Sequence, residues 1–469
     1  MGIGALDYKK GGSGLNINGI IEDYYVYAGE NVNAGDFVEF INGIAGKSTG
    51  TSEDTSTGTG NLNTSIYIKA IELDEKRVLV SYKKSDYLYG VVCSISGVSI
   101  TIGTHTKLSD NAYSGYCLAP VLIAKDKVFI AHTCTSSYSL YGIVCTINGT
   151  TITAGTDTSF GITVKYDSST GVSAALLSED KVFITYSYGS STYLYGTVCT
   201  ITDTTPAIGS KVKLNTSSGI GKYHSTITLP NGNVFLACGN GTMRGIVCTI
   251  SGTTITAGTH TALTSTTNSC TGNISTVLLE NSNVFVAYCS GSSSQYYLHG
   301  IVCSISGTTV AGGTITELSP ATYSGDKLSA TALYGNKVFI AHGRSSSYKL
   351  YGVVCSISGL SITTGADTSL GVSIYDGGEP GISAVRLNNG TVFLAHTVSD
   401  TRAMFAQIWG IDEENNIPTN EVTVAEYETQ VRPATTLPCK GVAKSSGEGG
   451  DETAHNEQVS IYVPELGVK

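Results

Sequence analysis

Six tyrosines in segments rich in serine and glycine are the side chains of this sequence best suited to touch a ligand. An aromatic face can stack on a sugar ring while serine, asparagine and aspartate side chains hydrogen-bond the hydroxyl groups. The alternative is that each tyrosine covers the edge of a strand. The candidate ligand-binding residues are Tyr138, Tyr188, Tyr296, Tyr323, Tyr348 and Tyr375.

Three histidines follow the same short motif, V-F-(I/L)-A, at His132, His342 and His396. Two histidines on neighbouring copies of a repeat could share a metal ion. Tyrosine or cysteine takes the same place in the other copies, however, at Tyr82, Tyr186, Cys238 and Tyr288. This exchange favours a strand-end position that accepts any medium-sized side chain with a polar tip. We therefore expect no metal site and no cofactor.

The carboxylates do not form a recognisable catalytic pattern. A glycosidase needs two of them about 5 to 10 Å apart across its cleft, whereas here they fall in turn-like segments such as Asp74-Glu75, Asp126 and Glu179-Asp180. The chain has a single tryptophan, no sialidase-type Ser-x-Asp-x-Gly-x-Thr-Trp box, and no Gly-x-Ser-x-Gly motif between a strand and a helix. We predict no catalytic residues and no enzymatic activity.

Two motifs recur along most of the chain. The segment YLYGVVCSISG (87–97) returns five times with an aligned glycine and once, at 403–413, in the degenerate form AMFAQIWGIDE. The spacing between aligned positions is 49 to 55 residues. A second motif, typified by KVFIAH (127–132), appears seven times at the same period. Such self-similarity is typical of a repeat architecture.

Each repeat contains four short runs with the composition of β-strands. A four-stranded unit cannot bury its apolar faces alone, but packing against its neighbours buries them, and closing the units into a ring protects the sheet edges. A period near 50 residues with four strands fits the blades of a propeller. The sequence therefore predicts an all-β, seven-bladed β-propeller over residues 64–425.

The connections between strands are of two kinds. The first and second strands, and the third and fourth, are joined by short turns. The second-to-third and inter-blade connections are longer and contain the six tyrosines. In an up-and-down blade both long classes emerge on one face, which is the face we expect to bind.

Both ends of the chain lie outside the repeats. Residues 1–60 contain strand candidates within 23–46 and a low-complexity linker at 47–65, and residues 426–469 contain further candidates. Each flank is too short for its own core. We predict that they combine into one small β-sandwich or barrel-like module into which the propeller is inserted.

Composition excludes other classes. Charged residues make up 14% of the chain and the formal net charge is −10, so no basic stripe exists for nucleic acid. No run approaches the ~18 to 20 apolar residues of a membrane helix, and the N-terminus lacks the pattern of a secretory signal. Six of the 12 cysteines share one repeat position. We expect these six to be small buried residues and all thiols to stay reduced.

The flanks resemble small β-modules of tailed-phage virion proteins. The resemblance rests on NVNAGDFVEFINGIAG (31–46), LPCKGVAKSSGEGGD (437–451) and QVSIYVPEL (458–466), which follow the pattern of head-decoration and head-fibre modules. The blades, with segments such as CTISGTTITAGT (248–259), are similar to phage and prophage structural propellers. The resemblance supplies no catalytic residues.

Together these observations predict a non-enzymatic phage virion surface protein, assembled in the bacterial cytoplasm. The terminal module would grip other capsid or tail proteins in multiple copies, with a homo-oligomer as one arrangement, and the propeller would display a glycan-binding face. The alternatives are a tail or baseplate receptor-binding protein, a propeller glycosidase or lyase, and a free-standing lectin. The interpretation includes neither nucleic acid nor membrane as a partner.

Overall fold

A computed structural model provides the structure. It describes residues 19–26, 31–32, 37–51, 55–56, 66–134, 138–165, 171–189, 192–215, 219, 221–265, 269–292, 295–319, 323–344, 349–374, 381–388, 390–398, 403–412, 417–419, 421–433, 441–443, 447–448 and 458–464. The contacts of the backbone divide the chain into two units, residues 49–422 and residues 1–48 with 423–469. Each unit is described by itself. Among the described residues no helix is long and apolar enough to cross a membrane.

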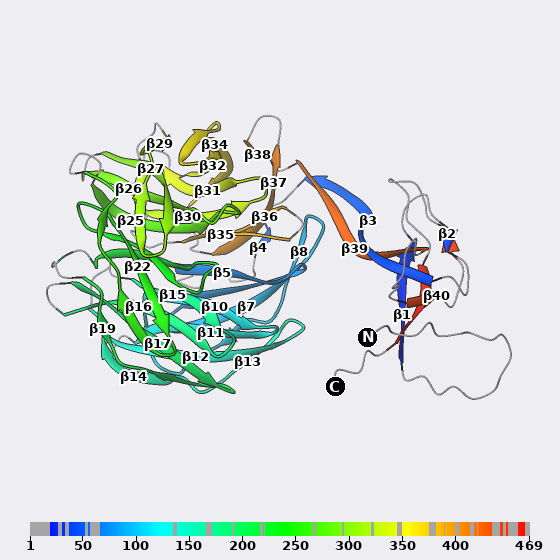
Figure 1. Ribbon diagram of the computed structural model, residues 1–469, viewed down its shortest axis with the longest axis horizontal. Coiled ribbons are helices and arrows are strands. Elements are labelled where there is room, and N and C mark those ends of the chain that lie inside the picture. The colour runs from blue at the N-terminus through cyan, green and yellow to red at the C-terminus, as the bar shows by residue number, and fades with distance from the viewer. Residues whose placement is uncertain are drawn as a thin grey trace. The chain divides into compact units, whose positions relative to one another are not determined.

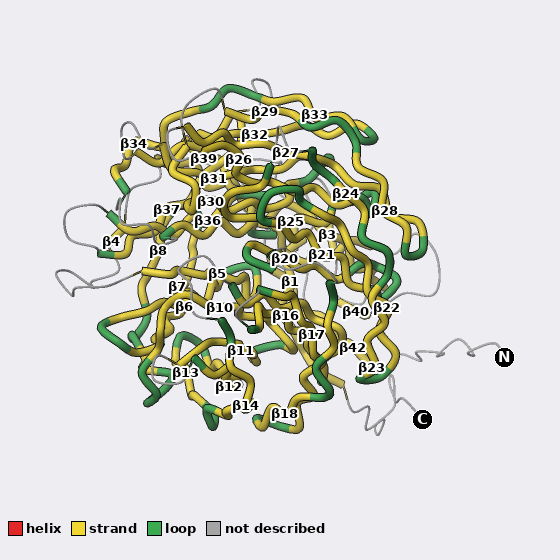
Figure 2. The backbone as a smooth tube through the Cα atoms, turned by 90° about the vertical axis from the view of Figure 1, so that its left-hand side faces the viewer, coloured by secondary structure: helices red, strands yellow, loops and turns green. Residues whose placement is uncertain are grey.

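The larger unit consists of seven antiparallel sheets, here called blades 1 to 7 in chain order (Figure 1). Their first strands lie toward the middle of the ring and their fourth strands toward the rim, as Figure 2 shows. The first strands are β5 (Ile66–Asp74), β10 (Tyr113–Ala124), β15 (Val172–Ser178), β20 (Tyr223–Thr228), β25 (Cys270–Leu278), β30 (Tyr323–Leu333) and β35 (Ile382–Arg386). Each contacts the next, and β35 contacts β5, so the ring is closed.

The second and third strands carry the two sequence motifs. The second strands are β6 (Arg77–Lys84), β11 (Lys127–Cys134), β16 (Lys181–Tyr188), β21 (Val234–Gly239), β26 (Val284–Ser292), β31 (Lys337–Arg344) and β36 (Val392–Thr397). The third are β7 (Tyr87–Ser96), β12 (Ser139–Asn148), β17 (Tyr193–Thr202), β22 (Arg244–Ser251), β27 (Gln295–Ser306), β32 (Lys349–Ser358) and β37 (Met404–Asp412). The predicted seven-bladed propeller is confirmed.

The fourth strand of each blade is in two pieces, both paired with the third strand. The first pieces are β8 (Ser99–Ile102), β13 (Thr151–Ala154), β18 (Thr205–Ile208), β23 (Thr254–Ala257), β28 (Thr309–Gly312), β33 (Ser361–Thr364) and β38 (Ile417–Thr419). The second pieces of blades 1 to 6 are β9 (Thr106–Lys107), β14 (Thr158–Thr163), β19 (Val212–Lys213), β24 (Thr261–Ala262), β29 (Thr316–Ser319) and β34 (Thr368–Ser373).

Blade 7 takes its second piece from the other end of the chain. Strand β4 (Thr55–Ser56) pairs with β37, Thr55 facing Ala406 and Ser56 facing Phe405 (Figure 1). These two residues fall within the segment that we predicted to be a linker, so that expectation was wrong at this point. The physical reason is that an unpaired edge of β37 needs hydrogen-bond partners, and the chain N-terminal to blade 1 supplies them.

The cores of the propeller lie between neighbouring blades. Alternate residues of each middle strand point to opposite sides, so one face packs on the preceding blade and the other on the next. Phe129 of blade 2, for example, packs in one cluster with Ile184 and Cys199 of blade 3. The six repeat-position cysteines are fully buried, as expected, and the eleven cysteines that the structure describes are free thiols. Cys439 lies outside the described residues.

The smaller unit contains strands from both ends of the chain. One sheet runs β1 (Gly19–Val26), β39 (Glu421–Pro433), β3 (Phe37–Thr51), β40 (Gly441–Ala443), β42 (Gln458–Pro464) and closes on β1. Strand β1 is antiparallel to β42 over Gly19–Tyr25. A short pair, β2 (Asn31–Val32) with β41 (Gly447–Glu448), completes the described strands. Strands β3 and β39 each continue across the boundary between the two units.

Candidate functional site

Three of the six candidate tyrosines have described side chains, and each lies on a different blade. Tyr138 precedes β12 with a φ of 50°, Tyr188 ends β16, and Tyr296 lies near the start of β27. All three are half-buried. Because second strands end where first strands begin, they share one face of the ring, which we call the long-loop face.

The structure does not bring these three tyrosines together into one pocket. The ring of Tyr188 packs edge-on against Tyr195, with its centroid 5.2 Å away, and the ammonium of Lys211 lies 4.4 Å from the Tyr188 centroid. Tyr296 packs against the core between blades 5 and 6. Tyr323 begins β30, where only the backbone is described, and Tyr348 and Tyr375 lie outside the described residues.

The histidine position of the repeat belongs to a stacked cross-strand pair. In blade 2 His132 faces Tyr141 with ring centroids 5.7 Å apart, and the equivalent residues stack in five other blades. Only blade 4 has no ring pair here, because Cys238 faces Arg244. In six blades a histidine or tyrosine ring therefore stacks on the third strand at this position, and the cysteine of blade 4 shows that stacking is not required there.

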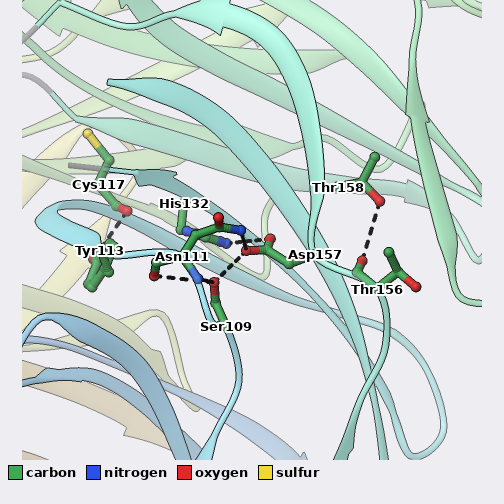
Figure 3. A network of polar contacts seen from close by, with 8 residues as sticks. All are labelled: Ser109, Asn111, Tyr113, Cys117, His132, Thr156, Asp157 and Thr158. Carbon is green, nitrogen blue, oxygen red and sulfur yellow. Dashed lines mark hydrogen bonds and ion pairs between the residues drawn. The ribbon is translucent and has the colours of Figure 1, made fainter. Parts of the chain in front are cut away.

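A buried polar network surrounds His132 at the junction of blades 1 and 2. Figure 3 shows His132, Ser109 and Asn111 directed toward the carboxyl group of Asp157. The Nε2 of His132 lies 2.8 Å from Asp157 Oδ1, while Ser109 Oγ and Asn111 Nδ2 donate to Oδ2. Because Ser109 and Asn111 belong to the end of blade 1, the network connects two blades.

The same arrangement recurs at the junction of blades 5 and 6. There Asp367 accepts from His342 Nε2 at 2.9 Å, from Ser319 Oγ, and from Arg344 Nη2 at 2.7 Å. Burial alone would raise the pKa of Asp367 and Asp157, but the hydrogen bonds and the neighbouring histidine hold each pKa below its usual value. Both carboxyls are therefore ionised at neutral pH.

These networks contain serine, histidine and aspartate but cannot activate a nucleophile. In a catalytic triad the histidine accepts the serine proton and the aspartate orients the histidine. Here Ser109 donates to Asp157 directly, and both His132 and Ser109 are almost fully buried. The networks fasten blades together.

The histidines do not form a metal site in the part of the chain that the structure describes. His342 uses Nε2 on Asp367, and no group of three histidine, cysteine, aspartate or glutamate side chains gathers among the described residues.

Hydrogen bonds from side chains of the first strands join neighbouring blades at five of the seven junctions of the ring. A serine hydroxyl on five of these strands accepts the backbone N–H of the next blade at 2.9 to 3.2 Å. The serines are Ser173, Ser225, Ser275, Ser329 and Ser383, and the last of them accepts from Ala70 and so joins blade 7 to blade 1. The register places Lys69 and Ala119 at the equivalent positions of blades 1 and 2.

A cavity of about 240 Å³ lies inside this ring. It is lined by residues near the start of β5 and β15, by Leu118, Ala119 and Pro120 in the middle of β10, and by parts of β20 and β25. The starts of the first strands are the ends nearest the long-loop face. Its polar lining includes Lys69, Ser173, Ser225, His224 and Asn273. No aspartate or glutamate belongs to the described lining.

Burial shifts the pKa of two of these lining groups. It lowers the pKa of Lys69, and it lowers the pKa of His224 to about 4 against the smaller opposing effect of the carbonyl oxygens of Thr185 and Gly221. The His224 ring nitrogens lie 3.4 and 3.2 Å from those oxygens. At the corresponding place the other first strands carry only aliphatic residues: Ile68, Leu118, Val172, Ile274, Leu328 and Ile382.

Sequence reasoning missed the cavity and its two ionisable groups, Lys69 and His224. A signal was present, because aligning the first strands places Lys69 among serines and His224 among aliphatic residues. The first strands have the weakest motif of the repeat, however, so their alignment becomes clear only from the pairing with the second strands.

No protein-family model and no curated protein matches the chain. Among solved structures, the BP39L lectin from Burkholderia pseudomallei matches with a TM-score of 0.59 at 8% identity, over 77% of this chain and 99% of the lectin. A protein from Lactobacillus plantarum matches at 0.51 and 14% identity, over 76% and 98%. A Bacteroides uniformis protein, provisionally named a 6-phosphogluconolactonase, matches at 0.51 and 10%, over 76% and 99%. The chain shares the fold of these proteins.

Proposed function

We propose that this protein is a non-catalytic, glycan-binding propeller whose ligands approach the long-loop face. The observation that carries the proposal is the polar cavity inside the ring, which lies toward the same face as Tyr138, Tyr188 and Tyr296. Rigid aromatic rings near small hydroxyl and amide side chains are the combination that sugar recognition uses. The shared fold with a lectin supports the proposal.

The chemistry of the cavity favours binding over catalysis. Sugar hydrolysis needs a carboxylic acid and a second carboxylate beside the scissile bond, and the described lining has neither. Asp157 and Asp367 are the carboxylates of the two inter-blade networks. Each already accepts three hydrogen bonds from side chains of the protein.

The proposal is tested by applying the purified full chain to a glycan array, with release of reducing sugars measured in parallel. We expect retention of some glycans and no release. A Tyr188→Ala variant should weaken retention by about two- to tenfold, the effect of losing one aromatic contact of about 0.5 to 1.5 kcal/mol. Tyr334→Ala is the matched control, because Tyr334 is 51% exposed in a turn on the opposite face. Cleavage of a glycan, or retention of none, would overturn the proposal.

Attachment to a phage particle is the second part of the proposal. It is supported by the smaller unit, in which strands from both chain ends pair and leave the propeller as one continuous insert. The module would bind capsid or tail proteins in several copies, which would strengthen weak glycan binding by avidity. Electron micrographs of particles labelled with antibody to this chain test it, and particles without label would contradict it.

A further inference from the structure

Lys69 is a charged residue at a position of the first strand where the other six blades have an uncharged one. It is the only charged residue at this position of the seven first strands, where five blades have serine and blade 2 has Ala119. In those five blades the residue accepts an N–H from the next blade. The residue of blade 2 that would donate to position 69 is Pro120, which has no N–H. The residue at position 69 therefore cannot accept the inter-blade hydrogen bond that the serines of the five other blades accept.

The surroundings of Lys69 are polar but not acidic. The described cavity lining contains hydroxyl groups of Ser173 and Ser225 and the amide of Asn273, and no carboxylate. No ion pair joins Lys69 to another described residue. Lys69 is half-buried. An ammonium that is partly withdrawn from water without a partner is costly, and a bound anion would relieve that cost.

We propose that the cavity binds the carboxylate of an acidic monosaccharide, such as a uronic acid, through Lys69. This inference rests on the proposed glycan-binding function and specifies its ligand class. Lys69 supplies the charge, and Ser173, Ser225 and Asn273 supply donors and acceptors for ring hydroxyls. Pockets for drug-sized ligands measure about 300 to 1,000 Å³, so a cavity of about 240 Å³ suits one terminal sugar ring rather than a longer chain.

The test compares methyl glucuronide with methyl glucoside, which differ only in the carboxylate, by isothermal titration calorimetry on the full chain at pH 7 and low salt. The variant is Lys69→Ser, because serine is the residue that this fold places there in five other blades. The matched control is Lys76→Ser, an exposed lysine in the turn between β5 and β6. We expect the wild type and Lys76→Ser to bind the glucuronide at least tenfold more tightly than the glucoside, and Lys69→Ser to lose this preference.

The outcomes separate this inference from the function on which it rests. If the array retains neutral glycans and Lys69→Ser binds as the wild type does, the inference fails and the proposed function survives. If neither protein retains any glycan, both fail. Inorganic phosphate is the third titrant, and displacement of the glucuronide by equimolar phosphate would show a general anion site and overturn the assignment to a sugar. Circular dichroism of each variant confirms that it is folded.

Discussion

The ring of first strands has two arcs that differ in what holds neighbouring blades together. From blade 3 through blade 7 to blade 1, a serine of each strand accepts an N–H of the next strand. From blade 1 through blade 2 to blade 3 the serine is replaced by Lys69 and then by Ala119. We call these the regular arc and the irregular arc.

Most of the cavity lining comes from the irregular arc, and its one lysine lies there. The contrast indicates that a propeller can lack these inter-blade hydrogen bonds at two junctions and remain a closed ring, because the other junctions keep them. The positions at those two junctions are free to carry ionisable groups. Four predictions probe this contrast, from the largest expected effect to the smallest.

The first concerns His224, which lies where the cavity meets the regular arc. Its folded pKa of about 4 is below the usual 6.5, so the folded state binds fewer protons than the unfolded chain between these values. The free energy of unfolding should therefore fall as pH drops from about 6.5 to about 4, by about 3 kcal/mol from this residue alone.

The matched variant is His224→Ile, because isoleucine occupies this place in blades 1, 5 and 7. Urea unfolding at several pH values measures both proteins. Burial also lowers the pKa of His299, but that residue is present in both and cancels. An unchanged pH slope in the variant would show that His224 is not buried as a neutral group.

The second prediction concerns the hydrogen bond between blade 7 and blade 1, which lies at the junction that closes the ring. In Ser383→Ala the N–H of Ala70 loses its partner at a position where Ser383 is only 4% exposed. A buried unsatisfied donor costs about 1 to 3 kcal/mol, and urea unfolding at pH 7 measures the loss. The control is Ser96→Ala, at the exposed end of β7 beside the turn to β8, and it should cost less than about 0.5 kcal/mol. Equal stability of both variants would remove the distinction between the arcs.

The third prediction is that Lys69→Ser stabilises the free protein. Burial lowers the folded pKa of Lys69, so the cost of its charge is fully present below that folded pKa and disappears as pH rises toward the usual 10.5. Wild-type stability should therefore increase with pH in the alkaline range, and the variant should show a flatter profile. Thermal unfolding from pH 7 to 10 measures this, and a less stable variant at pH 7 would mean that Lys69 makes a structural contribution.

The fourth and smallest effect is expected from introducing a hydrogen bond between the first strands of blades 2 and 3, where the serine is absent. Ala119→Ser places a hydroxyl opposite the N–H of Ala174, which has the same register as Thr226 in the regular arc. A new hydrogen bond there should add about 0.5 to 1.5 kcal/mol to the free energy of unfolding. A loss of stability instead would show that blades 2 and 3 are spaced differently from the blades of the regular arc.

Much of the fold could be predicted because its information is local and repeated. The alternation in segments such as KVFIAH and YLYGVVCSISG specifies strands with two buried faces, and seven copies specify seven blades. Strand β4 was harder to predict because it is two residues long and far from blade 7 in the chain. Its signal was the triplet Asp-Thr-Ser, which occurs at 54–56, at 157–159 before and in β14, and at 367–369 before and in β34.

The sequence by itself determined the blades, their number, and the buried places of the repeated cysteines, because periodicity assigns each side chain to a face. It also indicated that the histidine position tolerates tyrosine. Only the tertiary structure decided that β4 completes blade 7, that Asp157 and Asp367 accept from histidines 25 residues away, and that Lys69 lines a cavity whose described residues include no carboxylate. These features depend on which strands closure of the ring brings together, and no local pattern encodes that distance.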